Sequence, residues 1–178
     1  MKKIPVVLLA ILLLGSVQAF AVNDMFLKLV TIQGESVDSA HAGEIDILSW
    51  SWSMKQQYSS GGGSTTGKVV MDEIVLSKYV DKASPLLMLA VCNGQTQTQA
   101  TFIVRHAGST PFEWLKITLE NVVVTRVTPG GKREDDRLTE TISLNFKRVR
   151  VEYTEQKADG SAGTKTSFGW DLVNNVAL

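Results

Sequence analysis

The stretch GGGSTTGKVV at positions 61–70 has the residue types and the spacing of a phosphate-binding loop. Gly62, Gly67 and Lys68 match the pattern G-x-x-x-x-G-K, in which backbone amides and the lysine hold phosphate groups. The pattern continues with a hydroxyl that ligates magnesium, which Val69 cannot supply. The residues after the lysine are typical of a strand, whereas a phosphate loop leads into a helix whose N-terminus faces the anion. We therefore predict a glycine-rich loop that enters a strand, without a nucleotide cofactor.

Ser36, Asp38 and His41 are the residue types of a hydrolase triad. They crowd a single loop without a nucleophile elbow, so a polar, capped turn explains them better. His41 and His106, the two histidines of the chain, lie far apart and have no HxxxH or CxxC companion. Since zinc sites are recognised by such ligand spacing, we predict no metal site.

Two further features with reactive residue types are explained without catalysis. The acidic run at 134–136 lies between Arg133 and Arg137, as expected of a solvated hairpin end. Cys92 is the only cysteine and lies in an apolar run, which predicts a buried small hydrophobe rather than a reactive thiol. A single cysteine excludes an internal disulfide, so stability must come from core packing or assembly. We predict no catalytic residue in this chain.

Composition predicts a folded chain without an electrostatic partner. The chain has 178 residues, of which 44% are apolar, and 18 basic residues balance 18 acidic ones. This length favours a single domain. The balance of charge gives no field that would gather nucleic acid or an anionic membrane. We therefore expect no nucleic-acid partner.

The first 21 residues have the anatomy of a secretory signal peptide. Lys2 and Lys3 precede an apolar run of eleven residues at 4–14, and small residues follow that allow cleavage after Ala19 or Ala21. A membrane-spanning helix needs about 20 apolar residues, so we expect no stable membrane insertion. Retention of the segment as an anchor and a wrongly assigned start codon are the alternatives. Cleavage after Ala21 would leave 22–178, with 16 basic and 18 acidic residues.

Most of the remaining chain alternates with the period of β-strands. At 115–127 the odd positions are mostly apolar, which predicts a half-buried strand. At 138–153 the apolar positions change from even to odd around Lys147 and Arg148, as a β-bulge would cause. Such a long bent strand favours a barrel or a strongly curved sheet. Shorter strands are expected at 25–32, 44–54, 68–76, 100–105 and 166–171.

One helix is expected at about 84–93. Ser84 can cap its N-terminus, Pro85 suits its first turn, and Asn93 with Gly94 would end it. Leucine and methionine at 86–89 make nearly every side of this helix apolar. Because one sheet cannot cover all of that surface, we expect part of it to contact another subunit.

The strand expected at 44–54 has two chemically distinct sides. Large apolar residues occupy the even positions from 48 to 54, and small hydroxyl residues occupy the odd ones, Ser49, Ser51 and Ser53. The apolar side is typical of an aromatic core surface. The serine side is interpreted either as an ordinary exposed face or as a face kept smooth and uncharged because something slides past it.

Six segments, spread in order along the chain, carry a family resemblance. They are GES-x-D-x-x-H-x-GEIDILSWSW at 34–52, KYVDKASP-x-LMLA at 78–90, LKITLENVVV at 115–124, DRLTETISLNF at 136–146, EYTEQKADGSAG at 152–163 and FGWDL at 168–172. Together they resemble Hcp, the haemolysin-coregulated family, also called TssD, that forms the tube of bacterial type VI secretion systems. The resemblance extends from about Asn23 to near the C-terminus.

The resemblance implies a compact β-barrel-like domain of two packed antiparallel sheets with one short flanking helix at about 84–93. It implies homohexameric rings that stack into a hollow tube, which carries and chaperones effectors in its lumen and is itself secreted. Its expected partners are other copies of the chain, a VgrG-like spike, a contractile sheath and effector proteins. No enzymatic activity, cofactor or metal is implied.

Residues that match the family's segments inherit expected roles. The side of the strand with Ser49, Ser51 and Ser53 is expected to face the lumen, with Ser51 as the best candidate for cargo contact. Two turns are expected near ring-to-ring contacts, namely Asn93, Gly94 and Gln95, and Ala158, Asp159 and Gly160. The loop at 57–67, with Gly61, Gly62 and Gly63, is expected to pack on neighbouring subunits.

The segment 1–21 departs from the family pattern, because tube proteins of this kind ordinarily begin just before the segment Asp24-Met25-Phe26 and have no signal peptide. A copy sent to the periplasm could not join a tube that is nucleated in the cytoplasm. The chain is therefore either a tube subunit, with Met25 as a conceivable alternative start, or an exported binding module of the same fold that acts outside the cytoplasm independently of the tube. Secretion is expected on both interpretations, with periplasmic transit if the signal peptide is used and cytoplasmic assembly if it is not.

Overall fold

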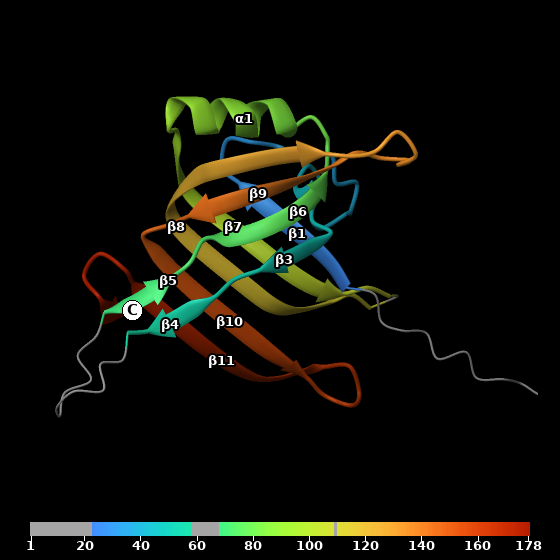
Figure 1. Ribbon diagram of the computed structural model, residues 1–178. Coiled ribbons are helices and arrows are strands. Elements are labelled where there is room, and N and C mark those ends of the chain that lie inside the picture. The colour runs from blue at the N-terminus through green and yellow to red at the C-terminus, as the bar shows by residue number, and fades with distance from the viewer. Residues whose placement is uncertain (1–22, 58–67, 109) are drawn as a thin grey trace, which may run out of the picture.

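The computed structural model describes residues 23–57, 68–108 and 110–178. The signal peptide predicted at 1–21 lies outside the described residues. The described chain forms twelve strands and one helix (Figure 1). These are β1 (Asn23–Leu29), β2 (Ile45–Asp46), β3 (Ser49–Ser51), β4 (Met54–Gln56), β5 (Val69–Met71), β6 (Ile74–Tyr79), α1 (Ser84–Asn93), β7 (Thr96–His106), β8 (Phe112–Gly130), β9 (Thr139–Asn145), β10 (Arg148–Gln156), β11 (Ala162–Asp171) and β12 (Val176–Ala177).

The 19-residue strand β8 is the common wall of the main sheet. One edge of β8 pairs with β7, while its other edge pairs first with β10 and then with β9. Two branches therefore leave the same strand, one through β9, β6 and β3 and one through β10, β11 and β12 (Figure 1). Every strand pair in both branches is antiparallel.

The short strands β2 and β3 close the first branch into a barrel. β2 pairs with β1, and β3 pairs with β6. Between them, the Ile47 amide donates to the Met25 carbonyl at 2.9 Å, and the Leu48 amide donates to the Ser77 carbonyl at 2.8 Å. One segment thus joins the edges of β1 and β6, and the strands β1, β7, β8, β9 and β6 form a ring. Closure of this kind removes free sheet edges.

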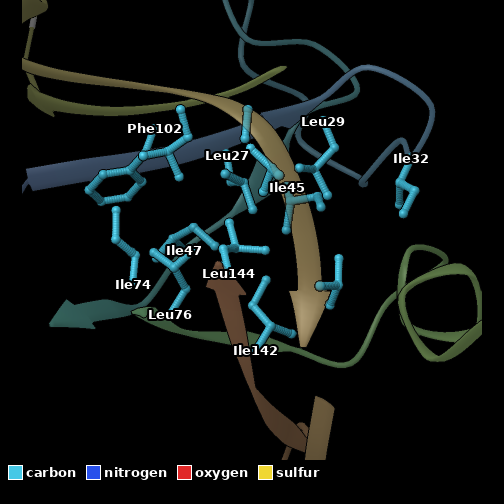
Figure 2. Close-up of a cluster of buried hydrophobic side chains, with 14 of the residues drawn as sticks. Leu27, Leu29, Ile32, Ile45, Ile47, Ile74, Leu76, Phe102, Ile142 and Leu144 are labelled. Carbon is cyan, nitrogen blue, oxygen red and sulfur yellow. The ribbon is translucent and has the colours of Figure 1, made fainter. Parts of the chain in front are cut away.

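Alternating apolar residues of these strands fill the barrel (Figure 2). Leu27 of β1, Ile45 of β2 and Leu144 of β9 are completely buried there. Full burial of one such side chain stabilises the fold by about 1.5–3 kcal/mol. The predicted fold class is confirmed, because the described part of the chain is mainly β, with one short helix and with strands in a ten-stranded and a two-stranded sheet.

The strand predicted at 138–153 is divided in the structure into β9 and β10. The buried positions change from even to odd at the predicted place, since Lys147 and Arg148 are both exposed and lie between the buried residues Phe146 and Val149. The prediction of one continuous bent strand was wrong, since β10 pairs with β8 at 115–120 and β9 pairs with it at 123–130, and residues 121 and 122 of β8 lie between the two ladders. There Asn121 adopts a left-handed φ of 53°.

The strand predicted at 44–54 is three short strands, β2, β3 and β4. Leu48 and Met54, expected on the core side, are 40% and 46% exposed. Their exposure follows from the changes of partner, since β2 pairs with β1, β3 with β6 and β4 with β5. Only the central alternation, with Trp50 and Trp52 packed against the core, follows the prediction.

Helix α1 confirms the expected range, 84–93, with Pro85 in its first turn. Gly94 ends it in a left-handed conformation, with φ 66°. The predicted cap by Ser84 was wrong, because Ala83 occupies the N-cap position without a side-chain hydrogen bond. The Ser84 hydroxyl instead donates to Glu140 Oε1 at 2.7 Å.

Lys78 of β6 and Glu140 of β9 form a buried ion pair next to the start of α1. The two residues are register partners, and Lys78 Nζ lies 2.8 Å from Glu140 Oε1. Lys78 has no exposed surface and Glu140 is 2% exposed. The same ammonium donates to Asp81 Oδ1 at 2.7 Å, and that oxygen accepts a bond from the Ala83 amide at 2.8 Å. The cluster therefore ties the first turn of α1 to the barrel wall.

Substitution Lys78→Met is expected to lower the free energy of unfolding by about 3–5 kcal/mol, because Glu140 would keep a buried charge without its counterion. The double variant Lys78→Met/Glu140→Leu leaves only the Asp81 carboxylate without its ammonium partner, whereas the single variant leaves two carboxylates, so the double variant should lose less stability. Urea denaturation of both variants measures the difference. An equal or larger loss in the double variant would contradict the assignment of the pair as a coupled buried charge.

Candidate functional site

The serines of β3 lie on the outside of the barrel. Ser49 and Ser51 are exposed, while Trp50 between them packs on the core. The Trp50 ring lies 5.3 Å from that of Phe102 and the Trp52 ring 5.9 Å from that of Phe146, measured between centroids. The partly buried indoles pack against the core and hold the strand in this orientation, so the hydroxyls of Ser49 and Ser51 face outward.

The serine side of β3 continues across three more strands. The register pairs Ser49 with Ser77 of β6, Ser77 with Thr141 of β9, and Thr141 with Thr128 of β8. We call this surface the hydroxyl face, defined by Ser49, Ser51, Ser77, Thr128, Thr139 and Thr141. Sequence reasoning found only its β3 part. The alternating segments IVLSKY and TETISLN indicate that β6 and β9 each have a polar side. Which residues of the two strands lie next to each other is known only from the strand register.

Ser53, the third predicted lumen residue, lies beyond the end of β3. Its hydroxyl donates to the Asp72 carboxylate, and the neighbouring Trp52 indole donates to the Asp72 carbonyl at 3.0 Å. Ser53 is exposed, but its hydroxyl already has an acceptor. The structure therefore brings Ser49 and Ser51 together on the hydroxyl face. It gives Ser53 a local role where the connection between β3 and β4 meets the connection between β5 and β6.

Helix α1 presents an apolar surface to solvent. Leu87 and Ala90 are completely buried, whereas Leu86 is 45% and Leu89 is 55% exposed. One face of the helix thus covers the barrel and the other is uncovered in the single chain, as expected for a helix that is apolar on nearly every side. Cys92 is exposed, so the prediction of a buried cysteine was wrong. It lies on the uncovered side of the last helical turn, which an apolar sequence neighbourhood could not reveal.

The two turns expected near ring contacts lie at opposite ends of the molecule. Figure 1 shows α1 at one end and the connection between β10 and β11 at the other. Asn93, Gly94 and Gln95 are all exposed at the end of the helix. In the second turn, Ala158, Asp159 and Gly160 are likewise exposed, and Gly160 has φ 84°.

Asp159 stabilises its own turn. Its Oδ1 accepts bonds from the Ser161 hydroxyl at 2.7 Å and from the Ser161 amide at 2.9 Å. The hydroxyl bond is the larger cause of the lowered pKa of Asp159. Gly61, Gly62 and Gly63, the third predicted contact region, lie outside the described residues.

The loop with the types of a triad is a polar, capped turn, as predicted. Asp38 Oδ1 accepts bonds from the amides of Ala40 at 2.9 Å and His41 at 3.1 Å. The His41 ring is buried, and its nitrogens lie near two carboxylates, Nδ1 3.0 Å from Glu44 Oε2 and Nε2 3.4 Å from Glu113 Oε1. The Ser36 hydroxyl instead accepts a bond from the Asp38 amide at 3.3 Å. The acidic run at 134–136 is fully exposed, as expected of a hairpin end.

Arg105 of β7 fixes this turn to the barrel. Its guanidinium donates to both carboxylate oxygens of Asp38, at 3.0 and 2.6 Å, and to Asp24 Oδ2 at 2.8 Å. Arg105 is 6% exposed, so its charge requires these acidic partners. The hydrogen bond from Arg105 is the largest cause that lowers the pKa of Asp38, from an ordinary 3.8 to about 2.

The described part of the chain offers neither a cluster of metal ligands nor a membrane-spanning helix. Nowhere in 23–57, 68–108 or 110–178 do three or more His, Cys, Asp or Glu side chains gather so that they could hold a metal ion. Among the same residues no helix is long and apolar enough to cross a membrane. The described surface includes three candidate contact regions, namely the hydroxyl face, the uncovered side of α1 and the two exposed turns.

Comparison with known proteins matches the chain to one family. Residues 26–153 match the family model described as "Type VI secretion system effector, Hcp". The chain is 45% identical over 157 residues to "Protein hcp1" of Pseudomonas aeruginosa, which covers 86% of this chain and 97% of that protein.

Solved structures agree with this match. The crystal structure of Hcp1 from Salmonella typhimurium aligns with a TM-score of 0.75 and 32% identity, over 89% of this chain and 100% of the other. The crystal structure of a type VI secretion system effector from Yersinia pestis aligns with a TM-score of 0.70 and 32% identity, over 83% and 99%.

Acid titration should isolate the contact between Arg105 and Asp38. Because the folded pKa of Asp38 lies below its ordinary value, its ionisation stabilises the fold above about pH 4, and this stabilisation is lost as the pH falls towards about 2. Asp38→Asn should be less stable than wild type at pH 7 and should lose less of its unfolding free energy between pH 4 and pH 2. Asp136→Asn, in the exposed acidic run, is the matched control for urea denaturation at each pH. A wild-type pH dependence in Asp38→Asn would refute the assignment.

Proposed function

The chain belongs to the Hcp family of type VI secretion proteins, and from this premise we propose that it is a structural subunit of the secretion tube. In this proposal homohexameric rings stack into a hollow tube, which carries and chaperones effectors in its lumen and is secreted with them. The observation that carries the proposal is the family match over residues 26–153, which include the barrel, α1 and most of β10. The proposed role is structural, without catalysis.

The uncovered surfaces of the chain support assembly. The exposed leucines on α1 favour contact with another copy of the chain, because burying apolar surface lowers the free energy. The turns 93–95 and 158–160 lie at opposite ends of the molecule, which suits a head-to-tail contact between stacked rings (Figure 1). A contact between two different surfaces of identical chains extends into an open stack when its rotation does not close into a ring.

The hydroxyl face is the proposed wall of the lumen. Ser49 and Ser51 are exposed there, and Ser51 is the proposed point of cargo contact. Small neutral hydroxyls offer hydrogen bonds without strong attraction to one partner, which suits a wall along which different proteins pass. The remaining proposed partners are a VgrG-like spike and a contractile sheath.

A second candidate function rests on the first 21 residues. Their positive start, apolar run and small residues at 19 and 21 are those of a cleaved signal peptide, with 22–178 as a single mature domain. In this alternative the chain is an exported binding module of the same fold, acting outside the cytoplasm independently of the tube.

Mass spectrometry of the N-terminus of secreted material separates the two candidates. A first residue of Phe20 or Val22 is expected if the signal peptide is used, and it would favour the exported module. A first residue near Met25 would favour secretion as part of the tube. Full-length chain in the secreted material would contradict cleavage.

Electron microscopy of the purified protein tests assembly. We expect ring-shaped particles with six-fold symmetry, and stacks of rings at high protein concentration. A protein that remains monomeric at high concentration by light scattering, and forms no rings on the grid, would refute the tube-subunit proposal.

The variant Ser51→Gln tests cargo contact in the lumen separately from ring assembly. The longer polar side chain should project from the hydroxyl face and reduce the amount of effector that co-purifies, while rings persist because no core contact changes. Unchanged co-purification would exclude Ser51 as a cargo contact.

A further inference from the structure

Two arginines stand on or beside the hydroxyl face without an ion-pair partner among the described residues. Arg126 of β8 is exposed and pairs in register with Ser143 of β9. Arg137 is also exposed, and its Cζ lies 3.9 Å from the centre of the Tyr79 ring. A guanidinium offers five donors in a planar fork that fits a carboxylate. Both groups are therefore available to bind an anion.

Arg126 lies in the same row as the proposed cargo contact. The register joins Ser51 to Val75, Val75 to Ser143, and Ser143 to Arg126. Three steps between neighbouring strands separate the backbones of Ser51 and Arg126 by about 14 Å. The register shift between Val124 and Arg126 sets the phase of the strand, so that Val127 packs on the core and Arg126 faces outward.

The two arginines are not neutralised by the strands that build the face. The charged residues within β6 and β9 are Lys78 and Glu140, which point into the barrel and bind each other at 2.8 Å. The outward residues of these strands are neutral and include Ser77, Thr139 and Thr141. Among the described residues, this part of the surface thus combines hydroxyls with two arginines that form no direct ion pair, and the exposed acidic run at 134–136 directly precedes Arg137.

We propose that this face selects cargo segments that carry carboxylates, with Arg126 and Arg137 as the specificity-determining residues. The proposal rests on the proposed function, since it names the chemistry of the cargo that the hydroxyl face contacts. Each guanidinium would bind an acidic side chain through charge-assisted hydrogen bonds, and the neighbouring hydroxyls would donate to the remaining oxygens. An acidic protein segment fits better than nucleic acid. Binding to a phosphate backbone depends on many basic residues, whereas the whole chain has equal numbers of acidic and basic residues.

Fluorescence anisotropy with the purified chain tests the proposal. The probes are a fluorescein-labelled octaglutamate peptide, an octalysine peptide and an eight-nucleotide oligo-dT, all at low ionic strength. Wild-type protein should prefer octaglutamate to both others, and added salt should weaken the binding. Arg126→Gln should raise the Kd for octaglutamate by about fivefold, the upper range for an exposed ion pair. Arg150→Gln, an exposed arginine of β10 outside the hydroxyl face, is the matched control and should bind as wild type.

Several outcomes would overturn the proposal. These are an absence of octaglutamate binding, binding of oligo-dT as tight as that of octaglutamate, an unchanged Kd in Arg126→Gln, or an equal loss in Arg150→Gln. The result is separable from ring assembly. A wild-type chain that forms rings but does not bind octaglutamate would refute this inference alone, whereas selective binding by a chain that forms no rings would support the charge preference and refute the tube role.

Discussion

The buried ion pair between Lys78 and Glu140 constrains the arrangement of the whole barrel. A lysine without exposed surface requires a carboxylate in direct contact, because removing its charge from water costs several kcal/mol. The two residues are register partners on β6 and β9, so a slip of one residue between these strands would separate them. The same ammonium holds Asp81, whose carboxylate also binds the first turn of α1. One charge thus fixes both a strand register and the position of the helix.

The register fixed by the ion pair between Lys78 and Glu140 also positions the hydroxyl face on the outside of the barrel. Neighbouring residues in a strand point to opposite sides, so when Lys78 points into the barrel, Ser77 and Tyr79 must point out. The partner strand behaves in the same way, with Glu140 inside and Thr139 and Thr141 outside. The register that satisfies the buried charges therefore also aligns the hydroxyls of different strands in rows. Surface chemistry and core stability are set by one alignment.

Features that depend on a few consecutive residues could be predicted from the sequence. The serine side of β3 follows from alternation, and the helix at 84–93 follows from its apolar body between Pro85 and Gly94. The cap assigned to Ser84 failed because a tertiary partner, Glu140, took its hydroxyl. Glu140 lies 62 positions from Lys78, and no local rule connects them. The rest of the hydroxyl face was missed for the same reason, since rows of side chains exist only once strands from distant parts of the chain are paired.

Closure of the barrel by β2 and β3 has a consequence for the order of folding. The segment that contains them joins strands that are near in sequence, Phe26 to Asp46 and Ser49 to Ser77, but the ring is complete only when β1 has also paired with β7 and β6 with β9. The pair of β1 with β7 joins Asn23 to His106. Contacts of such sequence separation form slowly, in milliseconds to seconds for chains of high contact order. Until these distant pairs form, the strand edges that they cover expose unpaired amides and carbonyls to other chains. The step that completes the ring is therefore also the step that protects its strands from intermolecular pairing, whereas the second branch still ends at the edge formed by β11 and β12.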